Sequence, residues 1–298
     1  MENKKRARVD LITGFLGAGK TTLIRKYMEY LDRRGISYMV IENEFGAAGV
    51  DASILGGNVR ELSGGCICCG QKVNFHNLLL ELAGEAERII VEPSGVFNAD
   101  DFFDIMDSPG LKEAAEYGFM AGVVNPAAMD SMSGAAEQVL ISELACAGAV
   151  VWSHTDVVPQ GSIGRAEEKL AGLLGAMPPA FDGARIDFDR LMECAPVRRA
   201  HERDRTDHST LFQSAVAYPS GRFTREGLTR AVEALFGGEA GAVLRVKGTV
   251  QSEEGRLTVN AAPGQIEIVP SSGEIGVNVI GNGLRRKVIR ALLEENGG

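Results

Sequence analysis

A glycine-rich segment near the start of the chain, residues 14–22 (GFLGAGKTT), constrains the fold more than any other feature. It fits the pattern G-x-x-x-x-G-K-[ST] and lies between an apolar run at residues 9–13 and a stretch with helical periodicity. Between a strand and a helix, such a loop turns successive backbone N–H groups toward a phosphate, and the helix dipole adds its positive end. The segment therefore predicts a P-loop, a bound nucleotide and an α/β fold.

The residue types in this loop predict individual roles. Lys20 supplies a positive charge to the β- and γ-phosphates, and Thr21 is expected to ligate Mg²⁺. The remaining positions expected to bind the nucleotide are Gly14, Gly17, Ala18, Gly19 and Thr22. A glycine-rich turn with a chance lysine is the alternative, which the flanking strand and helix disfavour.

Short apolar runs recur through the first half of the chain, with helical periodicity between them. They lie at residues 9–13, 36–41, 88–91, 121–124 and 149–152. Buried strands that alternate with helices are typical of a parallel sheet with helices on both faces. We therefore expect a P-loop NTPase domain with a parallel sheet and flanking helices over residues 1–195.

The pattern changes at residues 196–210, which hold few apolar residues and are expected to form a linker. Beyond them, strand-like and helical stretches follow one another closely. The strands are expected at residues 212–218, 243–250, 256–260, 265–269 and 275–280, and the helices at residues 224–236 and 284–293. Residues 211–298 are therefore expected to form a small α+β domain, in which the last four strands make an antiparallel sheet flanked by two helices.

Composition narrows the class of partner. With 31 Lys and Arg residues against 40 Asp and Glu, the formal net charge is −9, so the field of the protein repels nucleic acid and anionic membranes. Three of the five cysteines fall within four positions, which does not fit a secreted disulfide framework. No apolar run approaches the length of a membrane span. We expect a cytoplasmic protein that binds neither nucleic acid nor membrane.

A second segment, residues 88–95 (RIIVEPSG), ends a buried strand with an acidic residue and a glycine. A P-loop protein needs a strand-end carboxylate to support the Mg²⁺ shell and a backbone N–H to sense the γ-phosphate. We expect Glu92 to supply the first and Gly95 the second, so that both join Lys20 as catalytic residues. An ordinary turn is the alternative.

Three cysteines, Cys66, Cys68 and Cys69, lie in a loop bracketed by glycines. Thiolates clustered in this way can converge on one soft metal ion, whereas buried structural cysteines usually occur singly. The C-x-C-C spacing is too tight to complete a tetrahedral structural site, so the cluster predicts an open or shared site suited to transfer. Redox chemistry or simple packing of the thiols is the alternative.

Further metal ligands are expected in residues 41–46 (IENEFG), at the end of the second strand and on the same sheet edge as the P-loop. Glu42 is the stronger candidate there, and a role for Glu44 is left open. A ligand role for His76 is also left open, although packing or capping of a helix is the favoured interpretation. His201 and His208, in the linker, are weak candidates.

Together and in this order, GFLGAGKTT, IENEFG, GGCICCG and VEPSG closely resemble the motifs of the CobW-type metal-binding GTPases, relatives of the nickel-insertion GTPases UreG and HypB. The resemblance extends into the second domain through residues 243–248 (VLRVKG) and 280–284 (IGNGL). It implies hydrolysis of GTP to GDP coupled to delivery of a transition metal, Zn²⁺ or Co²⁺, to a client metalloprotein. By position, Glu42 and the three cysteines match the metal site of the family.

The chain departs from the family where guanine is read, because Ser153-His154-Thr155-Asp156 replaces N-K-x-D. The Asp156 carboxylate can still accept the N1–H and 2-amino groups of guanine, a pair that adenine lacks. Ser153 has no amide for the base edge, while His154 can offer a surface to the face of the ring. We expect Ser153, His154 and Asp156 to bind the nucleotide, and the choice between GTP and ATP stays open. Ala47 also replaces an acidic residue that often follows the switch glycine.

The sequence as a whole predicts a slow Mg²⁺-dependent GTPase whose nucleotide state changes the geometry of a thiolate metal site. A nucleotide- or metal-dependent homodimer stays open, as do the metal and the client. The alternatives are a P-loop kinase or ATPase that acts on a small molecule and a metal-dependent adaptor with negligible turnover.

Overall fold

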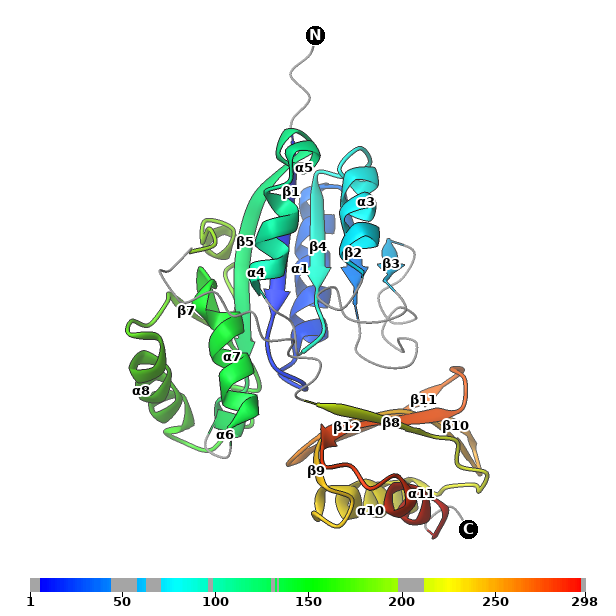
Figure 1. Cartoon of the computed structure of the whole chain (residues 1–298). Helices are drawn as coiled ribbons and strands as arrows, with labels where there is room; N and C mark the ends of the chain where they lie inside the picture. Colours follow the sequence, from blue (N-terminus) through cyan, green and yellow to red (C-terminus); the bar gives the residue numbers. More distant parts are fainter. Residues whose placement is uncertain are drawn as a thin grey trace. The chain divides into compact units, whose positions relative to one another are not determined.

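The computed structural model describes residues 6–43, 58–62, 71–95, 99–129, 132, 134–197 and 212–295. The chain divides into two compact units, the first holding the described residues up to 197 and the second holding residues 212–295 (Figure 1). Within this described part of the chain, no helix has the length and apolar character needed to cross a bilayer.

The first unit is built on a seven-stranded sheet in which all neighbouring strands are parallel. Its strands are β1 (Ala7–Thr13), β2 (Tyr38–Glu42), β3 (Val59–Glu61), β4 (Arg88–Glu92), β5 (Ala115–Val124), β6 (Ala149–Trp152) and β7 (Ala180–Asp182). The order β3-β2-β4-β1-β5-β6-β7 places β1 in the centre. Because all strands run in one direction, their carboxyl ends share one edge, where ligands of such sheets bind.

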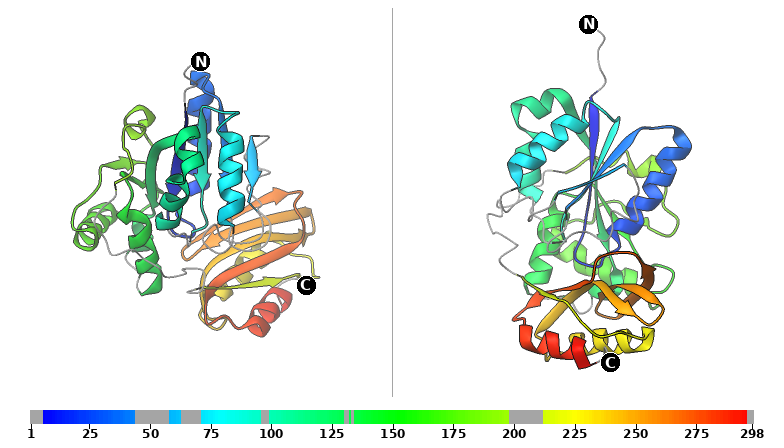
Figure 2. Two further views of the ribbon diagram at one scale, coloured as in Figure 1. Left: turned by 45° about the horizontal axis from the view of Figure 1, so that its top comes forward. Right: turned by 90° about the vertical axis from the view of Figure 1, so that its right-hand side faces the viewer.

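Helices cover both faces of this sheet (Figure 2). Helix α1 (Lys20–Arg34) lies on one face, and α3 (Lys72–Leu82) and α4 (Ala99–Met106) lie on the other. The remaining helices are α5 (Pro109–Ala114), α6 (Pro126–Met129), α7 (Ala135–Ala145), α8 (Ser162–Leu174) and α9 (Phe188–Leu191). The sequence prediction of a parallel sheet with flanking helices is therefore confirmed.

Helix α1 forms where the sequence places an apolar stripe. Leu23, Ile24, Tyr27 and Leu31 recur at helical spacing, and all four side chains are buried against the sheet. The helix ends at Gly35, which adopts the left-handed conformation (φ 64°) and donates its N–H to the Asp32 carbonyl oxygen at 3.1 Å. The stripe and its glycine stop thus fix the helix that follows the P-loop.

Two of the seven strands were missed in the sequence. β3 and β7 have three residues each, too few for alternation or an apolar run to stand out. β5 also begins at Ala115, six positions before the predicted start at residue 121, because the polar residues at its start belong to the strand. The other strands coincide with the predicted runs to within two residues.

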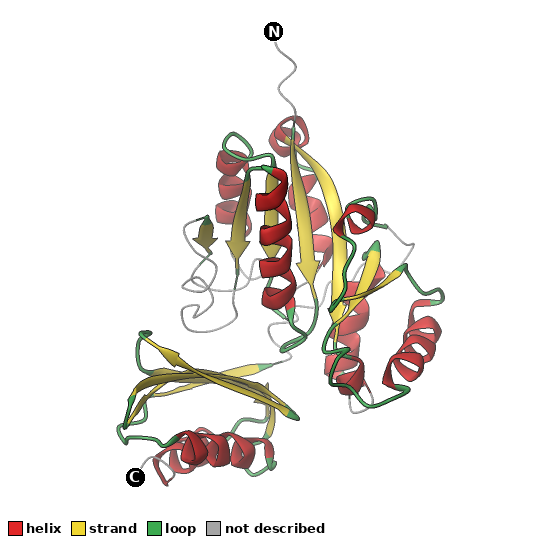
Figure 3. Cartoon of the chain, turned by 180° about the vertical axis from the view of Figure 1, so that it is seen from behind, coloured by secondary structure: helices red, strands yellow, loops and turns green. Residues whose placement is uncertain are grey.

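The second unit is a five-stranded antiparallel sheet. Its strands are β8 (Gln213–Ala217), β9 (Ala242–Ser252), β10 (Gly255–Ala262), β11 (Gln265–Ser271) and β12 (Gly276–Asn282). Helices α10 (Arg225–Phe236) and α11 (Arg286–Glu295) lie together on one face of this sheet (Figure 3). The expected small α+β class is confirmed, and the last four strands form an antiparallel sheet as expected. The structure adds that β12 pairs with β9 and that β8 joins the sheet beside β12.

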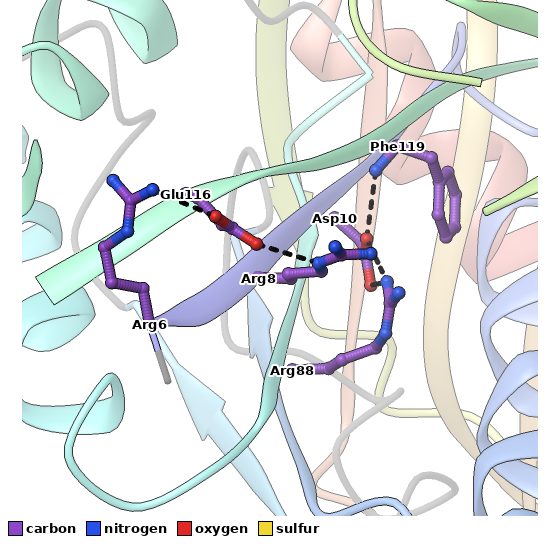
Figure 4. A network of polar contacts seen from close by, with 6 residues as sticks. All are labelled: Arg6, Arg8, Asp10, Arg88, Glu116 and Phe119. Atoms are coloured by element: carbon purple, nitrogen blue, oxygen red, sulfur yellow. Dashed lines mark hydrogen bonds and ion pairs between the residues drawn. The ribbon is translucent and has the colours of Figure 1, made fainter. Parts of the chain in front are cut away.

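A buried ionic cluster lies inside the first sheet. The Asp10 carboxylate, fully buried in β1, accepts two hydrogen bonds from Arg88 Nη1 at 2.6 and 2.7 Å and one from the Phe119 N–H at 3.1 Å (Figure 4). The Tyr27 hydroxyl donates to the same carboxylate at 2.9 Å. Burial raises the pKa of Asp10, and Arg88 opposes that rise. The cluster ties α1, β1, β4 and β5 together.

A β-bulge makes room for this carboxylate. The register between β1 and β5 shifts between Val9 and Leu11, so that Asp10 faces Gly118 and Phe119 of β5. A Cβ on Gly118 would collide with Asp10 Oδ1. The glycine and the bulge therefore admit a charged side chain into a strand that otherwise packs as core.

Candidate functional site

The P-loop connects β1 to α1 through three glycines in the left-handed half of backbone space. Gly14, Gly17 and Gly19 have φ angles of 142°, 76° and 97°. A Cβ on Gly14 would also collide with the carbonyl oxygen of Val123 in β5. Since no other residue type fits these positions without strain, the glycine spacing follows from the backbone path.

Lys20 is the first residue of α1, and its side chain is buried. Its Nζ donates a hydrogen bond to the Gly14 carbonyl oxygen at 2.8 Å, so the ammonium lies across the loop. Ala18 is also buried, and its N–H donates to the Phe15 carbonyl oxygen at 3.1 Å. The loop thus holds its one cation where the motif predicts the phosphates.

Thr21 and Glu92 meet at the start of α1 and the end of β4. The Thr21 hydroxyl is 3.0 Å from Glu92 Oε1 and 3.2 Å from Oε2. The Glu92 side chain is buried, and both groups offer hard oxygen atoms, the donor type that Mg²⁺ prefers. The two residues predicted to hold Mg²⁺, far apart in the sequence, therefore lie in contact and fit that ion.

Glu42 is the register partner of Glu92 on the neighbouring strand β2. Both side chains are buried, at 4% and 7% exposure. The Asn43 N–H donates to the Glu92 carbonyl oxygen at 2.9 Å, and the Asn43 amide group donates to Leu62 at 3.1 Å. Glu42, the candidate metal ligand, and Glu92, the candidate Mg²⁺ residue, are thus the last residues of two neighbouring, hydrogen-bonded strands.

Gly95 follows β4 and packs directly on the P-loop. A Cβ at this position would lie 2.7 Å from the Leu16 backbone nitrogen and 3.0 Å from its Cα. Backbone atoms cannot move aside as a flexible side chain can, so this close approach requires glycine. The segment predicted to sense the γ-phosphate is therefore in contact with the loop predicted to bind it.

A pocket of about 390 Å³ opens beside the P-loop at the ends of β5, β6 and β7. Its lining includes the predicted residues Gly19, Thr22, Ser153, His154 and Asp156. It also includes residues that were not predicted from the sequence to belong to the site, namely Leu23, Lys26, Val123, Val151, Gly183 and Ala184. The volume and position next to the phosphate loop suit a nucleotide base.

His154 forms one wall of this pocket in a left-handed backbone conformation (φ 56°). Its Nδ1 lies 2.9 Å from Ser153 Oγ, and its ring lies close to Gly19. Burial lowers the pKa of His154, and the Asp156 carboxylate partly opposes that change. A neutral, flat ring therefore faces the space where the sequence predicts the base.

The missed part of the wall is a short loop after β7. The Lys26 ammonium donates to the Gly183 carbonyl oxygen at 2.6 Å, which ties α1 to this loop. The Thr155 hydroxyl donates to Asp182 Oδ1 at 2.5 Å, and this hydrogen bond lowers the pKa of Asp182. The signal available in the sequence was weak, since only a glycine after a three-residue strand marks the loop.

Several predicted residues cannot be placed. Glu44, Ala47, His201 and His208 lie outside the described residues, as do the cysteines of the predicted metal site, Cys66, Cys68 and Cys69. His76 lies in α3 with its Nδ1 3.3 Å from the Asn77 side-chain oxygen. Among the described residues, no group of three His, Cys, Asp or Glu side chains could hold a metal ion. The predicted metal site therefore stays a prediction.

A parallel sheet whose central strand feeds a lysine-bearing glycine loop defines the class, a P-loop nucleotide-binding protein. The family follows from comparison with known sequences. The model of the CobW/HypB/UreG nucleotide-binding domain matches residues 8–178, more than half of the chain, and the chain belongs to this family. The family predicted from the motifs is thereby confirmed.

Curated relatives carry names that agree with this family. The zinc chaperone YeiR of Escherichia coli K12 is 30% identical over 156 residues, which cover 50% of this chain and 47% of that protein. The zinc chaperone CobW of Pseudomonas aeruginosa is 28% identical over 221 residues, which cover 62% and 58%. The zinc-regulated GTPase metalloprotein activator 1 of Schizosaccharomyces pombe is 36% identical over 102 residues, which cover 30% and 24%. The chain thus spans between 24% and 58% of the length of these relatives.

Proposed function

We propose that this protein is a Mg²⁺-dependent GTPase that binds a transition metal, Zn²⁺ or Co²⁺, and delivers it to a client metalloprotein according to its nucleotide state. Membership of the CobW/HypB/UreG family supports nucleotide binding and metal handling as a class. The names of the relatives, zinc chaperones and a zinc-regulated GTPase, support zinc and GTP as the ligands.

The observation that carries this proposal is the register of β2 and β4. Glu42 and Glu92 are paired across neighbouring strands, which lie about 5 Å apart in any sheet. Glu92 also accepts a hydrogen bond from the Thr21 hydroxyl at the start of the P-loop helix. Loss of the γ-phosphate would move the end of β4, and this movement would be passed to the Glu42 carboxylate on the adjacent strand. The affinity of the site for the bound metal would then change.

Each residue then has a defined part in the cycle. Lys20 and the P-loop N–H groups bind the phosphates, and Gly95 contacts the γ-phosphate. Mg²⁺, when bound, neutralises charge that develops on the phosphates, with Thr21 and Glu92 as the residues that hold its shell. Asp156 accepts the hydrogen-bonding groups of guanine, and Glu42 joins the cysteines of the C-x-C-C loop around the cargo metal.

The test is equilibrium binding of Zn²⁺ and Co²⁺ to the reduced protein loaded with a GTP analogue, GDP or an ATP analogue. The matched variants are the triple Cys66→Ser/Cys68→Ser/Cys69→Ser and the single Cys194→Ser, which removes a thiol near α9 that bonds to Arg190. We expect a thiolate-to-cobalt absorption band that the triple variant loses and Cys194→Ser keeps. The affinity should differ between the GTP-analogue and GDP forms.

Two outcomes contradict the proposal. Equal metal affinity in both nucleotide states would remove the coupling and leave an adaptor in which turnover does not control the metal. Tight nucleotide binding with no cysteine-dependent metal would leave a P-loop kinase or ATPase. GTP hydrolysis measured with and without metal separates these two.

A further inference from the structure

The pocket beside the P-loop lacks the usual donor for one edge of guanine. Guanine presents acceptors, O6 and N7, on one edge and the N1–H and 2-amino donors on the other. Asp156 can accept from the donor edge. The position that holds an asparagine amide in N-K-x-D is Ser153, whose hydroxyl oxygen lies 2.9 Å from His154 Nδ1. The acceptor edge therefore needs another partner.

The backbone of the loop after β7 does not supply it. The Gly183 N–H donates to the Trp152 carbonyl oxygen at 2.8 Å, and the Ala184 N–H donates to Asp182 Oδ1 at 2.9 Å. The Arg185 N–H donates to the Asp182 carbonyl oxygen at 3.1 Å. All three N–H groups already donate to oxygen atoms of the protein, one of them at the end of β6 and two at Asp182, so a base that enters the pocket finds them in use.

Lys26 carries a donor that remains available. It is the only Lys or Arg among the described residues that line the pocket, and its side chain is partly buried there. An ammonium group has three N–H donors and no acceptor. The contact with the Gly183 carbonyl oxygen at 2.6 Å uses one of them and fixes where the charge lies.

We propose that Lys26 is a specificity-determining residue that donates to the O6 and N7 edge of guanine, in place of the missing asparagine amide. This inference rests on the proposed use of GTP. Arg and Lys are the commonest partners of this guanine edge in other recognition settings. Adenine presents an amino donor where guanine presents O6, so Lys26 opposes adenine at the edge where it favours guanine.

The experiment compares equilibrium binding of four diphosphates to the wild-type protein and to Lys26→Met. GDP is the reference, 7-deaza-GDP lacks N7, 6-thio-GDP has a weaker acceptor in place of O6, and IDP lacks the 2-amino group. Arg25→Met, an exposed neighbour on the same helix, is the matched control. Lys26→Arg keeps the charge and the donors and is the rescue variant.

In the wild-type protein we expect 7-deaza-GDP or 6-thio-GDP to bind at least about tenfold more weakly than GDP, as for loss of a hydrogen bond to a charged group. Lys26→Met should lower GDP affinity to the level of that analogue, so that the preference disappears. The GDP-to-IDP ratio, which reports the Asp156 edge, should not change. Lys26→Arg should restore part of the preference, and Arg25→Met should behave as wild type.

Lys26 could instead only hold the loop through Gly183. In that case Lys26→Met weakens GDP and all three analogues by the same factor, and the inference is overturned. It is also overturned if the wild-type protein binds both edge analogues as tightly as GDP. A wild-type protein that binds no guanine nucleotide would sink the proposed function itself, which is a separate result.

Discussion

Glu42 and Glu92 are register partners at the carboxyl ends of β2 and β4, so their side chains leave the sheet on the same face. Only Glu92 is hydrogen-bonded to Thr21. Two buried carboxylates at one strand spacing would repel each other if both were ionised with no cation nearby. The proposed arrangement, with Mg²⁺ at Glu92 and the cargo metal at Glu42, would relieve that repulsion.

Glu92→Gln keeps the volume of the side chain and removes its charge. We expect the Mg²⁺ concentration that half-saturates GTP hydrolysis to rise by about 10- to 100-fold, the usual cost of removing a group that supports a metal shell. The check is a Mg²⁺ titration of hydrolysis, with Glu116→Gln as the control, because Glu116 bonds only to Arg6 and Arg8 among the contacts seen. An unchanged titration would show that Glu92 has no part in the Mg²⁺ site.

The variant Glu42→Gln should distinguish the role of the Glu42 carboxylate from that of Glu92. We expect weaker Zn²⁺ binding in the GTP-analogue form and a smaller difference between nucleotide states, since one anionic ligand is lost. The Mg²⁺ titration should stay close to wild type. If Glu42→Gln shifts that titration as far as Glu92→Gln does, the two residues serve one site and the prediction fails. Thermal melting of the variant checks that it folds.

Gly95→Ala introduces a Cβ against the P-loop backbone. Because the nearest atom is the Leu16 nitrogen at 2.7 Å, either the Gly95 segment or the loop must shift. A displacement of this kind at a reacting group costs up to about 100-fold in rate, so GTP hydrolysis should fall by about one to two orders of magnitude. Gly172→Ala, in α8 with nothing within 4 Å, is the control. Equal hydrolysis by both variants would contradict the role given to Gly95.

Arg88→Met removes the partner of a fully buried carboxylate. We expect the free energy of unfolding to fall by about 3–5 kcal/mol, because Asp10 is left without its counter-charge. Arg8 is the register neighbour of Arg88 on β1, but its side chain is 47% exposed and paired with Glu116. Arg8→Met should therefore cost less than about 1 kcal/mol. Urea unfolding of both variants makes the comparison, and similar losses would contradict it.

The His154 imidazole should make stability depend on pH. Burial lowers its pKa below the ordinary value of 6.5, so the unfolded chain binds a proton more readily than the folded protein. The stability that neutral His154 contributes is complete above pH 6.5 and is lost as the pH falls toward the lowered pKa. His154→Asn tolerates the left-handed backbone and removes the titrating group. The free energy of unfolding of the wild type should therefore fall relative to that of the variant as the pH is lowered from about 7 to about 5. Parallel curves for the two proteins would refute this.

The residues of the candidate nucleotide site that the structure brings together could be named from the sequence because each part is local. The P-loop glycines, Lys20 and Thr21 lie within one short segment, residues 14–21. Their spacing is set by the backbone path around a phosphate. Glu92 and Gly95 could be predicted because a strand end followed by proline and glycine is also a local pattern. The structure adds that Thr21 and Glu92 touch.

The parts that could not be predicted depend on contacts between distant segments. Asp10 interrupts the apolar run of β1, and Arg88 begins that of β4. Only the pairing of these two strands, with the bulge in β5 that makes room for Asp10, joins them as a buried pair. In the sequence, Lys26 looks like an ordinary polar residue of α1. Its contact with the Gly183 loop could not be predicted because that loop follows a strand of only three residues. Periodicity reports which face of an element is buried, and it carries no information about which distant element lies there.

The strand order of the second unit limits when its sheet can be completed during synthesis. β8 is at the edge of the sheet, and the partner it pairs with is β12, which is synthesised after the other four strands of this unit. Until β12 leaves the ribosome, β8 has an open edge with unpaired backbone groups, which favours association with other chains. The strands of the first unit have all emerged by then. The second unit should therefore fold late and be the part of the chain most dependent on chaperones during synthesis.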